Sequence, residues 1–378
     1  MPVDRRILRS LDGHLVLSVC LLVIFGLIAI YSATHNMPGA AGETTSYVKR
    51  QAVWTVLGTL LVGVLITFDY RYFGRFSRVL YLGSLLSLVL VAVMGYTSMG
   101  AQRWLDLGPI PRWQPSEFVK IALIITLAKH LDQKEKLDSF SDLISPLVHM
   151  GLPILLILIQ PDLGSCMIYT IICLGMLYMA GATPKHILLL SGGIIGAGAL
   201  ATFLSSMGWL PIIKEYQLKR LMVFINPYAY KHGAGWNVIQ SIIAIGSGRF
   251  FGKGLFSGTQ TQLSFLPSRH TDFIFSVVGE EMGFLGAVSL LGIYFWFLYR
   301  CLKTMMEVDN RFGRLLVSGV FFLFLAHLLI NVGMCLGLMP ITGKTLPFLS
   351  YGGSSTLANY AALGILFNVN MRRKKIHF

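Results

Sequence analysis

The sequence predicts an all-α polytopic membrane protein with ten transmembrane helices, and three observations carry this prediction. The 378 residues are 54% hydrophobic and only 13% charged, and the mean hydropathy of +0.67 is high for a soluble globular domain. Apolar runs of about the length that crosses a bilayer recur along the chain. These runs lack the alternation of barrel strands, so helices are favoured.

The predicted spans follow one another along the whole chain. The first run follows Arg5, Arg6 and Arg9, as a signal peptide would, but it is long and has no obvious small-residue cleavage site, so we interpret it as a retained signal anchor. The fifth run is short, and a tight hairpin at Gln160-Pro161-Asp162 is expected to separate it from the sixth. The ten spans are residues 13–33, 51–68, 79–97, 117–131, 146–159, 163–182, 186–206, 273–298, 315–336 and 351–370.

The distribution of Lys and Arg indicates the orientation of the spans. If both termini are cytoplasmic, most basic residues lie in cytoplasmic segments, as the positive-inside rule requires. The short outer loops then hold few of them, namely Lys49, Arg50, Arg103, Arg112 and Lys344. One long extracytoplasmic segment, residues 207–272, is exempt from the rule and is expected to form interfacial or re-entrant helices. Residues 1–378 are predicted to form a single integral membrane domain.

Several other classes of site are not indicated. The five cysteines fall in or at the ends of spans without metal-ligand spacing, so neither disulfides nor zinc are expected. The formal net charge is +14, but the basic residues are mostly loop anchors, so anionic lipid is the expected partner and nucleic acid is not. The glycine-rich residues 191–199 have no preceding strand and indicate close helix packing rather than a phosphate loop.

Polar residues at the predicted outer face are the functional candidates. Glu117 and Lys120 are spaced i, i+3 on one face of a helix, where a structural ion pair is the alternative interpretation. Asp162 lies at a helix start, where it could simply cap the helix. The basic and apolar residues of 216–255 are explained by default as side chains that snorkel to the lipid surface.

The stretch LPSRHTDFIF, residues 266–275, places three ionisable residues directly before an apolar run: Arg269, His270 and Asp272. Helix capping by Thr271 or Asp272 is the alternative interpretation. The amide dipoles and Arg269 are expected to keep Asp272 ionised. All four clusters fall at one membrane face, and together they suit an amphiphile that carries phosphate. Glu117, Asp162 and Asp272 could also bind Mg²⁺ or Mn²⁺.

Five ordered motifs resemble the SEDS family of shape, elongation, division and sporulation proteins. The resemblance covers essentially all spans, and the GTQTQLSFLP stretch is more similar to the elongation branch than to the division branch. Two departures concern Ser268, where the family usually has Glu, and Lys344-Thr345, at a usually apolar position. The motifs are GAQRWLDLG with QPSEFVK, QPDLGS, GWNVIQSIIAIGSGRFFGKGL, GTQTQLSFLPSRHTDFIFSVVGEEMGFLG and MPITGKTLPFLSYGGSS.

The resemblance implies a peptidoglycan glycosyltransferase that polymerises lipid II at the outer face of the bacterial plasma (inner) membrane, as part of the elongation machinery. It also implies a class B penicillin-binding protein, a transpeptidase, as partner. A lipid II flippase is the chief alternative, because it would use the same cations without chemistry, and a non-catalytic scaffold is a third.

The resemblance and the chemistry together assign roles to the candidate residues. Asp272 matches the family's catalytic aspartate and would take the proton of the acceptor hydroxyl. Cations would stabilise the departing pyrophosphate, and the donor carbon would be inverted. Arg50, Arg103 and Lys120 are the candidates for this, Arg269 and His270 would also contact substrate, and Glu117 and Asp162 would orient Lys120 or bind a divalent cation.

Overall fold

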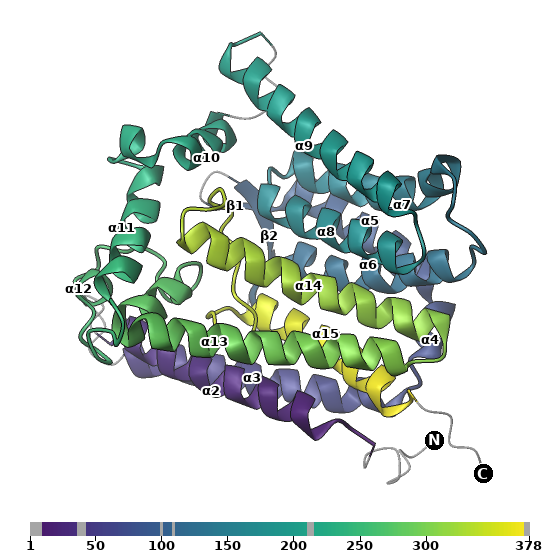
Figure 1. Ribbon diagram of the computed structural model, residues 1–378, viewed down its shortest axis with the longest axis horizontal. Helices are drawn as coiled ribbons and strands as arrows, with labels where there is room; N and C mark the ends of the chain where they lie inside the picture. Colours follow the sequence, from purple (N-terminus) through teal and green to yellow (C-terminus); the bar gives the residue numbers. More distant parts are fainter. Residues whose placement is uncertain (1–9, 36–42, 99–100, 108–109, 210–214, 374–378) are drawn as a thin grey trace.

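The computed structural model describes residues 10–35, 43–98, 101–107, 110–209 and 215–373. The described chain is mostly helical, and most of its long helices lie alongside one another (Figure 1). Arg5, Arg6, Arg9, Lys374 and Lys375 lie outside the described residues. The long helices are α2 (Gly13–Thr34), α3 (Glu43–Thr67), α5 (Ser77–Met94), α6 (Pro115–Asp132), α7 (Phe140–Ile159), α8 (Leu163–Met179), α9 (Pro184–Ser206), α13 (Ile274–Glu307), α14 (Arg311–Cys335) and α15 (Gly353–Met371).

Each of the ten predicted spans coincides with one of these helices. In the described chain, seven are long and apolar enough to cross a membrane: α2, α3, α5, α7, α9, α13 and α14. Helix α8 is apolar but has only 17 residues. Helices α6 and α15 contain buried polar side chains, such as Lys120 and Asn368. The chain is therefore a multi-pass membrane protein, and the count of ten spans remains a prediction.

The hairpin at Gln160-Pro161-Asp162 is present. Helix α7 begins with a capping box at Ser139 and contains Pro146 and Pro153 without ending at either. It ends at Ile159 with Gln160 as its C-cap residue, and Asp162 is the N-cap residue of α8. The polar tripeptide therefore lies at the turn between two helices rather than inside one.

The segment between α5 and α6 differs from the prediction. A loop is expected there, but the segment contains a small antiparallel sheet of β1 (Tyr96–Ser98), β2 (Ala101–Leu107) and β3 (Ile110–Trp113), in the order β1-β2-β3. The fold is mostly helical, as predicted, but this small sheet was not expected. It forms because a segment between apolar runs can satisfy its backbone groups by pairing with itself. The short helix α4 (Arg71–Arg75) lies before α5.

The long segment before α13 is helical, as predicted. It contains α10 (Glu215–Ile225), the 3-10 helix η1 (Pro227–Tyr230), α11 (Ala234–Ser247) and α12 (Thr259–Gln262). In Figure 1 these elements lie together at one end of the bundle, and α11 and α12 lie beside the start of α13. Their interfacial position in the membrane remains a prediction.

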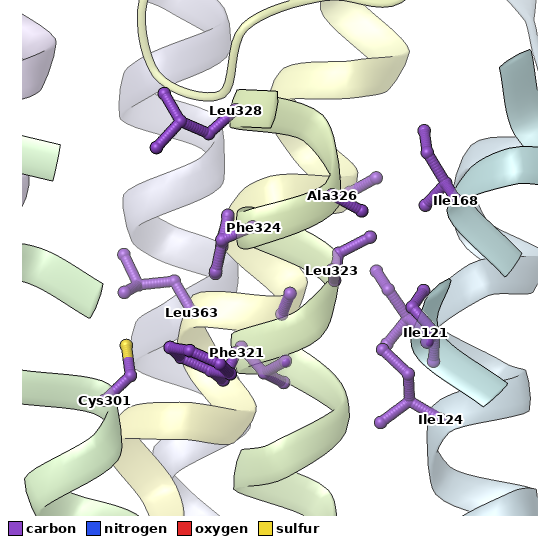
Figure 2. Packing of buried hydrophobic residues seen from close by; sticks show 14 of the residues in the cluster. Ile121, Ile124, Ile168, Cys301, Phe321, Leu323, Phe324, Ala326, Leu328 and Leu363 are labelled. Atoms are coloured by element: carbon purple, nitrogen blue, oxygen red, sulfur yellow. The ribbon is translucent and has the colours of Figure 1, made fainter. Parts of the chain in front are cut away.

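Helix α14 lies at the centre of the bundle. It packs against α6, α8 and α13, and Figure 2 shows its apolar side chains between those of neighbouring helices. Phe324 of α14 meets Phe297 of α13 edge to face, with ring centroids 5.1 Å apart. By contrast, α9 has no buried residue and extends along the margin of the bundle (Figure 1).

Helix α13 is broken at Gly283, which has a φ of +64°. The break frees backbone groups, and residues 249–254 bind them. Lys253 N donates to Glu280 O at 3.0 Å, and Phe284 N donates to Arg249 O at 2.9 Å. Residues 249–254 are thereby fastened to α13, whose first piece begins two residues after Asp272.

Candidate active site

Asp162 lies at the start of α8 and is buried among donors. Its carboxylate accepts hydrogen bonds from Ser165 N at 3.0 Å and Ser165 Oγ at 2.8 Å, so the predicted capping role is present. Lys344 Nζ donates to the same carboxylate at 2.9 Å. Burial opposes ionisation, but Lys344 and Arg103 hold the pKa of Asp162 well below its usual range.

Arg103 belongs to the Asp162 cluster. It lies on β2, and its guanidinium donates to Pro161 O. Its Nη1 is 3.8 Å from Asp162 Oδ1, and Tyr216 of α10 lies 3.5 Å from Nη2. Arg103, a predicted site residue, therefore reaches the α7–α8 hairpin from a sheet that was not predicted.

Glu117 and Lys120 form the predicted ion pair, and a third residue extends it. Lys120 Nζ is 2.8 Å from Glu117 Oε2 and 2.8 Å from His327 Nε2, and all three side chains are buried. The other ring nitrogen of His327 faces Thr345 O at 3.0 Å. Lys120 can donate to Nε2 only if His327 carries its proton on Nδ1, and this tautomer also satisfies Thr345 O.

Asp272 lies directly before α13, where Phe273 is the N-cap residue and makes no side-chain cap bond. The alternative role of Thr271 or Asp272 as the helix cap is therefore wrong. The backbone oxygen of Asp272 accepts a hydrogen bond from Asn331 Nδ2 at 2.8 Å. The side chain is partly exposed and makes no ion pair within the described part of the chain.

The surroundings of Asp272 differ from those expected. Burial raises its pKa, although Lys344, Arg220 and the Thr271 hydroxyl oppose this effect. Arg269 was expected to stabilise the carboxylate, but its Nε donates to Ala33 O at 2.7 Å. A carboxylate with a raised pKa is the better proton acceptor, so this environment suits a general base.

Arg269, His270 and Arg50 lie apart from these contacts. Arg269 is buried against the end of α2, and its Nη2 has no partner among the described residues. The His270 ring packs against Tyr47 and Tyr351, and burial together with Arg269 lowers its pKa to about 4. Arg50 is exposed on α3. Substrate contact by these three residues remains a prediction.

Glu117, Asp162 and Asp272 do not fit a shared metal site. Each of the first two is already paired with a lysine, and no group of three or more His, Cys, Asp or Glu side chains in the described ranges is placed to hold a metal ion.

Sequence reasoning missed several residues of the cluster. Lys344 was counted as a loop residue and as a departure from the family pattern but was not predicted as a site residue, although its ammonium binds Asp162. His327 and Asn331 are polar residues within an apolar run, which is itself a signal of function in a membrane span. Their partners lie far away in sequence, so spacing could not identify them.

The fold and this buried charged cluster define a helical membrane protein with a polar site assembled at the ends of its spans. The family model described as "Cell cycle protein", of the FtsW, RodA and SpoVE proteins, matches residues 13–375. The chain belongs to this family, which is the SEDS family indicated by its motifs.

Named relatives match almost the whole chain. A "Probable peptidoglycan glycosyltransferase FtsW" of Trichlorobacter lovleyi is 38% identical, over 96% of this chain and 94% of the relative. A "Peptidoglycan glycosyltransferase RodA" of Treponema pallidum is 34% identical, over 96% and 98%. One solved structure, "Structural coordination of polymerization and crosslinking by a peptidoglycan synthase complex", has a TM-score of 0.78 at 34% identity, covering 96% of this chain and 98% of that one. The chain is a glycosyltransferase of this family.

Proposed function

We propose that this protein polymerises peptidoglycan by transferring the glycan of lipid II from undecaprenyl pyrophosphate to an acceptor sugar hydroxyl. The observation that carries the proposal is the placement of Asp272. Its partly exposed carboxylate has no ion-pair partner in the described chain, whereas Glu117 and Asp162 nearby are neutralised by lysines. It is therefore the carboxylate free to take a proton.

The proposed reaction needs a base but no acid. The acceptor oxygen attacks the anomeric carbon of the donor while its proton moves to Asp272. The bond from that carbon to the phosphate oxygen breaks, and the electron pair leaves with the pyrophosphate. Attack opposite the leaving group inverts the donor carbon. Lys120 and Arg103 are our candidates for stabilising the charge that develops on the pyrophosphate.

We further propose that the site faces outward at the bacterial inner membrane and that the reaction serves cell-wall elongation. The elongation role rests on the GTQTQLSFLP motif, since relatives named FtsW and RodA match almost equally well. A solved complex that coordinates polymerisation and crosslinking supports a partner transpeptidase, a class B penicillin-binding protein. A partner helix would pack against the lateral surface of the bundle.

The decisive experiment is glycan synthesis from purified lipid II in detergent, where a flippase has no measurable activity. Wild type is expected to form polymer, and Asp272→Asn is expected to form none, because the amide preserves shape but accepts no proton. General bases typically contribute roughly 10²–10⁴-fold. A folded Asn variant within about tenfold of wild type, below that range, contradicts the assigned role, and an inactive wild type contradicts the function.

A further inference from the structure

The segment 343–345 contacts each of the three clusters of the site. Gly343 lies against Asp272, since a Cβ at Gly343 would be 3.3 Å from Asp272 Oδ2. The side chain of Lys344 binds Asp162. Thr345 O faces the His327 ring that contacts Lys120. Three consecutive residues thus connect the base, the α8 terminus and the Lys120 network.

Lys344 is the central residue of this segment and is held at both ends. Its Nζ donates to Asp162 Oδ2 at 2.9 Å and to Ser165 Oγ at 2.6 Å, and the residue is only 3% exposed. Its backbone oxygen accepts from Asn331 Nδ2 at 2.7 Å. The same Asn331 amide donates to Asp272 O at 2.8 Å. The side chain of Lys344 therefore fixes Asp162, and its backbone is tied to Asp272.

The start of α8 has room for this lysine because residue 164 is a glycine. A Cβ at Gly164 would lie 2.7 Å from Lys344 Cε and 2.9 Å from Lys344 Cγ. The methylene chain of Lys344 thus occupies the space that a side chain at this position would need. The close packing of Lys344 against Gly164 is a second, steric reason why the Lys344 side chain has one fixed position.

We propose that Lys344 is a positioning residue for the transfer reaction, which joins Asp162 to Asp272 and places a fixed positive charge between the carboxylates of the site. The inference rests on the proposed function. Lys344 acts through Asp272 and not on the acceptor itself. A buried ammonium in a site of low dielectric interacts more strongly with nearby charges than an exposed one does.

The charge of Lys344 has a measurable consequence for pH dependence. Asp272 is also faced by Arg220 from α10, the Thr271 hydroxyl and the Cys335 thiol of α14. Of these groups, Lys344 and Arg220 are cations that favour the ionised carboxylate. Removing Lys344 therefore raises the pKa of Asp272, and the acid limb of the polymerisation profile moves to higher pH.

The test compares Lys344→Met with Lys344→Arg in the full-length protein, using kcat for lipid II polymerisation as a function of pH. The Met variant is expected to lose roughly 10- to 100-fold in kcat, because small displacements of catalytic groups have effects of this size. Its acid limb should move up by about one pH unit. The Arg variant should restore the position of the limb, because it restores the charge.

Two further variants separate positioning from general damage. Gly164→Ala keeps the charge but displaces the lysine, so kcat should fall while the protein remains folded. Lys219→Met is the matched control, because Lys219 is exposed and its ion pair among the described residues is with Glu215 on α10; it should behave like wild type. A Lys344→Met protein that polymerises like wild type with an unmoved acid limb overturns the inference.

Thermal unfolding does not depend on activity, so it distinguishes failure of the inference about Lys344 from failure of the proposed function. Thermal unfolding of Lys344→Met, Asp162→Asn and the double variant forms a double-mutant cycle. Non-additive shifts in Tm are expected, because the two side chains share one ion pair. Additive shifts contradict the positioning role, whereas a wild type that forms no polymer contradicts only the proposed function.

Discussion

Lys120 is a buried cation that forms an ion pair with Glu117 and a hydrogen bond with His327. Replacing it with Ala should abolish most polymerisation, because the developing pyrophosphate charge loses its counterion. The same change leaves Glu117 buried and unpaired, which costs about 3–5 kcal/mol of stability. Lys120→Arg should also fail, since the guanidinium is larger and donates in other directions. The measurements are polymer yield and thermal unfolding in detergent.

A paired variant separates chemistry from folding at this position. Lys120→Met with Glu117→Gln removes both charges together, so the folded state should recover stability relative to Lys120→Ala. Activity should remain absent if Lys120 serves the leaving group. Near-normal turnover by the paired variant would show that Glu117 and Lys120 form only a structural ion pair.

At the residue scale, local spacing predicted local contacts and nothing more. The i, i+3 pair of Glu117 and Lys120 and the capping role of Asp162 follow from neighbouring positions in a helix. Lys120 and His327 are separated by 207 positions, and Asp162 and Lys344 by 182. Only the packing of helices brings these residues together, so a single sequence contains no spacing rule for them.

At the scale of elements, the break in α13 is a structural requirement that we can test. Gly283→Ala places a Cβ 2.2 Å from Gly252 N, at a φ of +64° that L-residues adopt only with strain. We expect a loss of about 1–3 kcal/mol, together with weaker polymerisation, because α13 begins beside Asp272. Thermal unfolding of the purified variant measures the first effect.

The same helix offers a matched control. Gly292 has nothing within 4 Å of its potential Cβ, and it lies within α13 beyond the break. Gly292→Ala should stabilise the helix slightly, by about 0.5–1 kcal/mol. Equal behaviour of the two variants would mean that the break at Gly283 contributes nothing to stability.

Elements were predicted well where an apolar run is long and poorly where the backbone departs from helix. Run length located most of the ten long helices, since lipid leaves few alternatives to a helix. The polar tripeptide Gln160-Pro161-Asp162 was also needed to separate the fifth helix from the sixth. The sheet of β1, β2 and β3 was missed because it lies between two apolar runs and because β1 and β3 have only three and four residues. The break at Gly283 was missed because a positive φ inside an apolar run has no compositional signal.

At the scale of the whole molecule, the number of predicted spans between the site residues agrees with the predicted topology. Glu117 lies at the start of α6, Asp162 at the start of α8, and Asp272 just before α13. Two predicted spans separate each of these from the next, and two more separate Asp272 from Lys344. Residues separated by an even number of crossings lie at the same membrane face, so the observed contact of Asp162 with Lys344 is consistent with ten spans.

That topology predicts opposite accessibility for two exposed positions. Ser257 lies in the segment before α13 and should face outward, whereas Asp138 lies between α6 and α7 and should be cytoplasmic, because basic residues accumulate on that side. Cysteines introduced singly at these positions, in a chain whose five native cysteines are replaced, would be exposed to an impermeant maleimide in intact spheroplasts. Position 257 should react and position 138 should react only after lysis. The reverse pattern would show that the protein has the opposite orientation in the membrane, with Asp272 on the cytoplasmic side. A polymerase that works at the outer face could not use Asp272 there.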